Sequence, residues 1–126
     1  MALVLDASSL LAFLHKEPGA EQVWSALSGA LVGAVNWSEV VQKSLQRQAD
    51  ITGMRQEFAD AGVVFVPFTA EQAEIAAHLW GTTRAFGLSL GDRACLALAV
   101  ERQLTILTAD RAWSKLSLEV DIQFIR

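Results

Sequence analysis

The stretch Leu3-Val4-Leu5-Asp6-Ala7-Ser8-Ser9-Leu10-Leu11 joins a short apolar run to an aspartate, two hydroxyl residues and an apolar pattern of helical spacing. Residues 3–5 are apolar on both faces, which is typical of a strand in the middle of a covered sheet. An acid at the carboxyl end of such a strand lies where open α/β sheets bind their ligands. Asp6 is therefore either a ligand-binding residue or the cap of the next helix, and this stretch alone leaves both roles open.

The composition is that of a compact globular protein. Of the 126 residues, 52% are hydrophobic and 19% are charged, and this length predicts one domain that spans residues 1–126. The single cysteine, Cys95, excludes an internal disulfide framework and fits a reducing compartment. No apolar run approaches the roughly 20 residues that span a bilayer, and no basic segment precedes the first apolar stretch. We therefore expect a cytoplasmic protein without membrane contacts.

The net charge of −4 narrows the classes of nucleic-acid-binding protein that fit. It argues against a module that binds nucleic acid through its overall field, because such domains are usually basic. It does not exclude a nuclease, because bound cations reverse the charge of an acidic metal site. The positions of the acids therefore matter more than their number.

Apolar runs alternate with helical patterns along the whole chain. The alternation predicts an α/β fold, a three-layer α/β/α sandwich whose mostly parallel central sheet is covered by helices on both faces. Strands are predicted at residues 3–5, 30–35, 63–67, 104–108 and 122–125. Helices are predicted at residues 8–15, 20–27, 37–48, 50–61, 69–80, 93–100 and 113–118, and the helix at 93–100 is apolar enough to be central and buried.

Four acids differ from the others in their context. Asp6 and Asp110 follow predicted buried strands, Asp92 opens the most apolar helix, and Glu39 lies one turn into a helix. Simpler roles exist, since Asp92 and Asp110 suit helix caps and Glu39 is spaced to pair with Lys43. In a parallel sheet, however, strand ends and helix starts share one edge, so the four acids can converge. Clustered carboxylates repel each other unless a cation compensates, which favours a Mg²⁺ or Mn²⁺ site.

These acids lie in four segments of the chain, at residues 4–8, 36–40, 88–99 and 107–113. In order and spacing the segments resemble the PIN-domain ribonucleases, and the chain as a whole is similar to the VapC toxins of bacterial toxin–antitoxin pairs. The resemblance implies a PIN-like fold, Mg²⁺ or Mn²⁺ as cofactor, RNA as substrate, a protein antitoxin of the VapB type that covers the acidic groove, and a homodimer. It implies as metal-binding and catalytic acids Asp6, Glu39, Asp92 and Asp110, and as polar support Thr108, Ser8 and Asn36.

The chemistry that such acids permit is metal-assisted hydrolysis of an RNA phosphodiester bond. We expect Asp6 and Asp92 to bind metal directly, and Glu39 and Asp110 to bind through water or to position the nucleophile. The number of metal ions is left open. Two basic residues, Arg93 and Arg111, each follow a predicted ligand and are candidate RNA contacts, although such charges also occur on any helix surface.

Other classes of protein fit the sequence less well. Haloacid-dehalogenase-like phosphatases require a second aspartate where this chain has Ser8, and two-component receiver domains require a Lys-Pro step, whereas neither Pro18 nor Pro67 follows a lysine. A catalytically inactive PIN-like module that binds RNA or protein is a further alternative, and the complete set of four acids argues against it. Cys95 is expected to be a packed small hydrophobe rather than a nucleophile.

Overall fold

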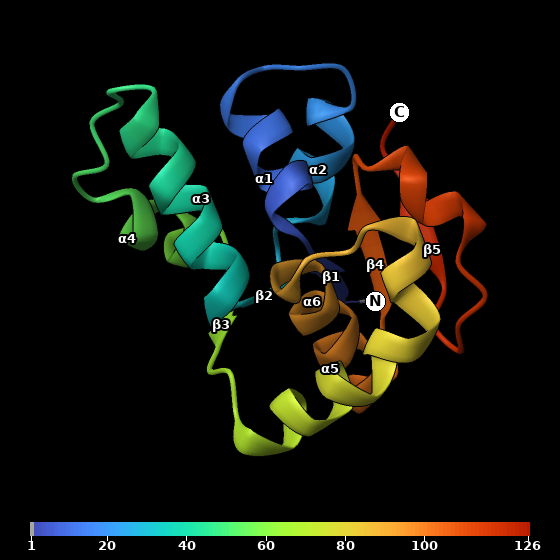
Figure 1. Cartoon of the computed structure of the whole chain (residues 1–126). Helices are drawn as coiled ribbons and strands as arrows, with labels where there is room; N and C mark the ends of the chain where they lie inside the picture. Colours follow the sequence, from blue (N-terminus) through green and yellow to red (C-terminus); the bar gives the residue numbers. More distant parts are fainter. Residues whose placement is uncertain (1) are drawn as a thin grey trace.

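The computed structural model describes residues 2–126 and shows a central sheet with helices packed on both of its faces (Figure 1). All neighbouring strands in the five-stranded sheet run parallel, in the order β3-β2-β1-β4-β5. The first strand of the chain is therefore the middle strand of the sheet, as its apolar sequence predicts. The strands are β1 (Leu3–Leu5), β2 (Leu31–Gly33), β3 (Val64–Val66), β4 (Thr105–Thr108) and β5 (Ile122–Phe124).

Helices connect the strands throughout the described residues, which confirms the predicted α/β fold. No helix in residues 2–126 combines the length and the apolar character that crossing a membrane requires. The α-helices are α1 (Ala7–Leu14), α2 (Ala20–Ala26), α3 (Ala34–Gln46), α4 (Met54–Asp60), α5 (Ala70–Thr83) and α6 (Leu90–Arg102), and the 3-10 helices are η1 (Arg84–Phe86) and η2 (Arg111–Lys115).

Two hydrophobic cores lie on opposite faces of the sheet. Successive side chains of a strand point to opposite faces, so Leu5 packs into one core and Val4 into the other. The first core includes side chains of α1, α2, α3 and α4, and the second is filled largely by α6, whose residues 94–99 are all buried. Its position between the sheet and α5 explains why α6 is apolar on nearly all sides (Figure 1). The predicted central helix is thus confirmed.

One helix begins earlier than its sequence predicts. The sequence predicts a helix over residues 37–48, but α3 begins at Ala34, directly after Gly33 of β2. Asn36 therefore lies inside the helix, where its side chain is buried and donates a hydrogen bond to the backbone of α6. A partner distant in the sequence, rather than the end of the helix, determines the role of this asparagine.

Two further predicted helices differ in extent or type. The predicted helix at 50–61 begins only at Met54, because Asp50 accepts a hydrogen bond from the Thr52 backbone N–H in a separate turn. The predicted helix at 113–118 is instead the 3-10 helix η2, and the Asp110 side chain caps it. Both differences arise from side-chain hydrogen bonds in local turns, which the spacing of apolar residues does not predict.

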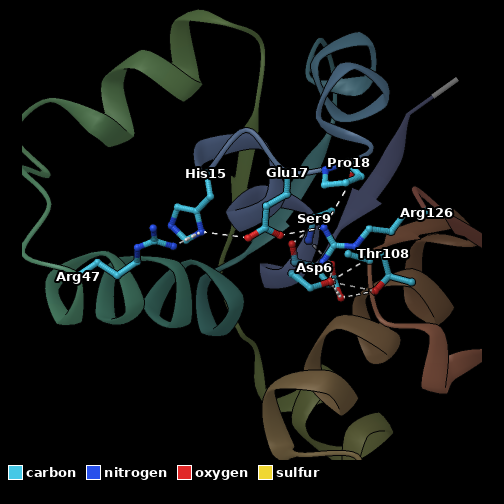
Figure 2. A network of polar contacts seen from close by, with 10 residues as sticks. Asp6, Ser9, His15, Glu17, Pro18, Arg47, Thr108 and Arg126 are labelled. Atoms are coloured by element: carbon cyan, nitrogen blue, oxygen red, sulfur yellow. Dashed lines mark hydrogen bonds and ion pairs between the residues drawn. The ribbon is translucent and has the colours of Figure 1, made fainter.

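The C-terminal end of the chain packs closely against the segment that joins α1 and α2. Gly19 has a left-handed backbone with φ of +94°, and a Cβ atom on it would lie 2.5 Å from the Ile125 carbonyl oxygen. Beside this contact, Arg126 Nη1 donates a 2.8 Å hydrogen bond to Glu17 Oε1 (Figure 2). Glycine at position 19 is therefore required by both its conformation and its neighbour.

We expect Gly19→Ala to lower the free energy of unfolding by about 2–5 kcal/mol, as measured by urea denaturation. A left-handed alanine costs about 1–2 kcal/mol, and overpacking against backbone adds about 1–3 kcal/mol. The matched control is Gly29→Ala, since Gly29 has φ of +83° but nothing lies within 4 Å of its added Cβ. That control should lose only the conformational part, and equal losses in the two variants would contradict the packing argument.

Candidate active site at the carboxyl edge of the sheet

Asp6 is a helix cap, and it also lies at the position where a ligand-binding acid is expected. Its backbone is extended, and its Oδ1 accepts a 2.9 Å hydrogen bond from the Ser9 backbone N–H, which makes it the N-cap of α1. It also follows the central strand directly, at the edge where open α/β sheets bind ligands. Only 4% of the residue is exposed. The cap therefore holds a nearly buried carboxylate in a defined place.

The register of the sheet brings a second strand end to Asp6. Leu5 of β1 pairs with Leu107 of β4, so the residues that follow them lie side by side. The Thr108 hydroxyl donates a 2.6 Å hydrogen bond to Asp6 Oδ2 (Figure 2), and Ser8 Oγ lies 2.8 and 2.9 Å from the two carboxylate oxygens. The structure thus places Ser8 and Thr108, both predicted as polar support, directly on Asp6.

This hydrogen-bond network extends to the backbone that follows β4. Ser8 Oγ accepts a 3.0 Å hydrogen bond from the Ala109 N–H, and Thr108 Oγ1 accepts one of 3.1 Å from the Asp110 N–H. The two hydroxyls therefore link the Asp6 carboxylate to the backbone of Ala109 and of Asp110. Ser9, which the sequence analysis did not select, is fully buried, and its hydroxyl donates to the Asp6 carbonyl at 3.0 Å.

No cationic side chain of residues 2–126 forms an ion pair with Asp6. Burial raises the pKa of Asp6 above its ordinary value, and the hydrogen bonds from Thr108, Ser9 and Ser8 lower it by less than burial raises it. The ion pairs among the described residues do not include Asp6. The protein thus meets the hydrogen-bonding needs of this carboxylate but leaves its charge uncompensated. A bound cation would fit this environment.

Glu39 reaches the same edge from α3, with Asn36 as its partner one turn earlier. Asn36 is 2% exposed, and its Nδ2 donates two 3.0 Å hydrogen bonds, one to Glu39 Oε1 and one to the Gly91 carbonyl of α6. The alternative ion pair of Glu39 with Lys43 is not among the ion pairs of the described residues. Asn36 therefore supports Glu39 and joins α3 to the first turn of α6.

Asp110 is the N-cap of η2, as its simpler interpretation predicts, whereas Asp92 is the third residue of α6 and completes the capping box of the N-cap Ser89. Asp92 Oδ2 accepts a 3.0 Å hydrogen bond from the Ser89 backbone N–H, while Ser89 Oγ accepts from the Asp92 N–H in a capping box. Asp110 Oδ1 accepts a 3.0 Å hydrogen bond from the Ala112 N–H at the start of η2. Both aspartates are half-buried, so each borders solvent at the edge of the sheet.

Cys95 of α6 lies near three of the four acids. Its thiol is fully buried, and burial raises its pKa well above the ordinary value. The charges of Asp6, Asp92 and Glu39 raise this pKa further, which requires all three to lie within Coulombic range of one sulfur atom. A high pKa makes Cys95 a poor nucleophile, in agreement with its predicted packing role.

Convergence at one edge does not bring these side chains into contact. Within residues 2–126, no three His, Cys, Asp or Glu side chains are close enough together to hold a metal ion as they stand. Each carboxylate is directed by its own hydrogen-bond donors, and repulsion between like charges favours the separation. Asp92 and Asp110 are half-buried, and either would have to give up its hydrogen bond from a backbone N–H before it could turn toward a shared ion.

The two arginines predicted as RNA contacts lie in different environments. Arg93 Nη1 donates a 3.0 Å hydrogen bond to the Ala76 carbonyl, so its guanidinium binds the backbone of α5. Arg111 is exposed and lies 4.6 Å above the Phe124 ring, directly after Asp110. Of the two, only Arg111 presents its charge to solvent beside the acids.

Replacing the buried charge tests this description of Asp6. Because burial raises its pKa, the folded protein binds this proton more tightly than the unfolded chain does, and the ionised carboxylate reduces stability as the pH rises through the folded pKa. Asparagine caps helices as well as aspartate does. We therefore expect Asp6→Asn to raise the free energy of unfolding at pH 7 in EDTA, and the gain to shrink toward acid pH. A gain that is absent at pH 7, or that does not depend on pH, would contradict the description.

The chain is similar to known proteins in both sequence and fold. A family model described as the PIN domain matches residues 3–118. A search of curated proteins gave no significant match. Solved structures do match: a toxin–antitoxin complex from Klebsiella pneumoniae is similar over 98% of both chains, with 17% sequence identity and a TM-score of 0.74.

Two other solved structures match over comparable lengths. DNA-bound VapBC from Salmonella typhimurium matches 100% of this chain and 99% of that chain, with 11% identity and a TM-score of 0.75. VapC20 of Mycobacterium tuberculosis is described as a toxin that cleaves the sarcin–ricin loop. It matches 94% of this chain and 98% of its own, with 15% identity and a TM-score of 0.72. Identities this low show a shared fold, which confirms the PIN-like α/β/α architecture. Because the family model covers nearly the whole chain, this protein belongs to the PIN-domain family.

Proposed function

We propose that this protein is a metal-dependent endoribonuclease and the toxin of a toxin–antitoxin pair. The observation that carries the proposal is the Asp6 carboxylate, which is 4% exposed, follows the central strand and has no cationic partner within residues 2–126. Membership of the PIN-domain family and the fold shared with VapBC complexes support it. Burying an anion without compensation lowers stability, so we infer that its charge serves a bound cation.

The donors at the edge fit a hard divalent cation. Asp6 and Asp92 would hold Mg²⁺ or Mn²⁺, with Glu39 and Asp110 nearby, and the ion would make a bound water more acidic and stabilise the leaving oxygen. Ser8 and Thr108 hold the Asp6 carboxylate in one orientation, and Asn36 holds that of Glu39. The chain itself thus supplies carboxylates whose directions are set in advance.

A groove beside Glu39 supports the proposal of an antitoxin partner. It is lined by side chains of α3 and the start of α6, and it includes Val35, Glu39 and Leu90. A second hollow that shares Ser38 continues it along α3 to Leu45. Leu45 and Leu90 are 55% and 54% exposed, which leaves apolar surface next to an acid. We propose that a segment of the antitoxin covers this groove, with a basic group near the carboxylates. A homodimer and a cytoplasmic location remain predictions.

The strand order argues against one alternative function. Receiver domains share the flavodoxin-like strand order 2-1-3-4-5, whereas this sheet has the order β3-β2-β1-β4-β5. A PIN-like module without catalytic activity has the same fold as a nuclease, and the four acids at one edge favour the nuclease. Measuring RNA cleavage decides between these two.

We expect the purified protein to cut RNA when Mg²⁺ or Mn²⁺ is present and to stop when EDTA is added. Asp6→Asn should lower the cleavage rate by about 10²–10³-fold, the usual effect of removing one preorganised electrostatic group. Rates are measured on cellular RNA with mapping of the new ends. The matched control is Asp60→Asn, which changes an exposed aspartate at the end of α4 and should leave the rate unchanged. Metal-dependent cleavage at the wild-type rate by folded Asp6→Asn would refute the assignment.

The partner proposal has a separate test in cells. Expression of this chain alone should arrest growth, and co-expression of an antitoxin, sought in the neighbouring reading frame, should relieve the arrest. Leu45→Lys should weaken the purified complex about tenfold, because it places a charge in the apolar groove. Val64 is 52% exposed on β3 and does not line the groove, so Val64→Lys is the control. Equal affinities for the two variants would place the partner elsewhere.

A further inference from the structure

The carboxylate of Glu39 rests against α6 at a residue that has no side chain. A Cβ atom built on Gly91 would lie 2.6 Å from Glu39 Oε1, 2.6 Å from Oε2 and 2.7 Å from Cδ. Contacts this short do not occur between a real Cβ and its neighbours. A methyl group at position 91 and the Glu39 carboxylate therefore cannot both occupy these places.

Backbone conformation does not explain the glycine at this position. Gly91 is the second residue of α6, and it is not among the described glycines with positive φ. Alanine is a better helix former than glycine, so a helix alone favours replacement. The glycine is instead required by the Glu39 carboxylate, which belongs to α3 and lies where a Cβ atom of residue 91 would be.

Asn36 sets the direction of the same carboxylate. Its Nδ2 donates 3.0 Å hydrogen bonds to Glu39 Oε1 and to the Gly91 carbonyl. These two acceptors determine the amide orientation, because the reverse orientation would place Oδ1 against two oxygens. Asn36 Oδ1 is buried and has no hydrogen-bond partner among the described residues. A buried acceptor without a partner lowers stability, and the amide nevertheless keeps this orientation.

We propose that Gly91 and Asn36 are positioning residues that together form a seat for the Glu39 carboxylate. Gly91 provides the space, Asn36 provides the hydrogen bond, and both hold Glu39 against the turn of α6 that carries Asp92. The seat thus sets the relation between two acids on different helices. Its consequence for metal binding rests on the proposed function, whereas the seat itself rests on the contacts alone.

The test is Gly91→Ala, read first without metal. The atoms that clash lie at the end of a flexible side chain, so the fold should persist while Glu39 rotates away. We expect an unchanged or raised Tm together with shifted NMR signals of the Asn36 side-chain amide, which loses its bond to Glu39. The affinity for Mn²⁺, measured by electron paramagnetic resonance, should fall about 10–100-fold, as for other residues that orient ligands.

Two comparisons separate positioning from a general effect of the substitution. Gly81→Ala is the matched control, because Gly81 lies in α5 and an added Cβ there meets nothing within 4 Å. It should change neither the Asn36 amide signals nor the Mn²⁺ affinity. In a Glu39→Ala background, Gly91→Ala should also have no effect on either, because the carboxylate it displaces is gone.

Two results would overturn the proposal. One is a Gly91→Ala protein with unchanged Asn36 amide signals, and the other is a shift of the same size in the Glu39→Ala background. If the wild-type protein binds no Mn²⁺, the proposed function fails, and the Asn36 amide signals still decide whether the seat exists.

Discussion

The burial of the Asp6 carboxylate at the end of β1 is the interaction on which the rest of the site depends. Ser9, Ser8 and Thr108 satisfy its oxygens with hydrogen bonds, yet none of the ion pairs in the described part of the chain balances its charge. An uncompensated buried anion costs several kcal/mol in typical proteins, and a fold selected for stability alone would replace it. Buried charges without a partner, like other departures from what stability favours, are found mainly at functional sites. Burying the charge of Asp6 lowers the stability of the fold, and this loss supports a cation bound beside the carboxylate.

The acids at the edge act as helix caps and as candidate ligands at the same time. Asp6, Asp92 and Asp110 each accept a hydrogen bond from a backbone N–H at the start of a helix. A cap ties the carboxylate to backbone, so each of these three acids has a defined orientation in the metal-free protein. Glu39 is the exception, because it lies inside α3 and depends on Asn36 and on the space at Gly91. The capping and ligand interpretations of these residues therefore do not exclude each other.

Local patterns in the sequence predict the element order and the edge of the site, and contacts between distant residues determine the rest. Alternating apolar runs and helices suffice for the parallel sheet, since each signal spans only a few residues. The start of α3 at Ala34 and the hydrogen bond from Asn36 to α6 depend on a helix 55 residues away, which no local pattern contains. Trp113 is buried while Trp24 and Trp80 are 64% and 53% exposed, although each of the three lies in a predicted helix. Arg93 likewise binds α5 because of packing that the sequence does not display.

Anomalous diffraction from crystals grown with Mn²⁺ tests the central claim most directly, because it locates the cation without relying on activity. The account predicts an anomalous peak bonded to the Asp6 carboxylate, with Asp92 turned from its Ser89 cap or joined to the ion through water. Crystals of Asp6→Asn grown in the same solution should lack that peak. A wild-type structure in which Mn²⁺ is absent from Asp6, or occupies only exposed acids elsewhere, would contradict the account.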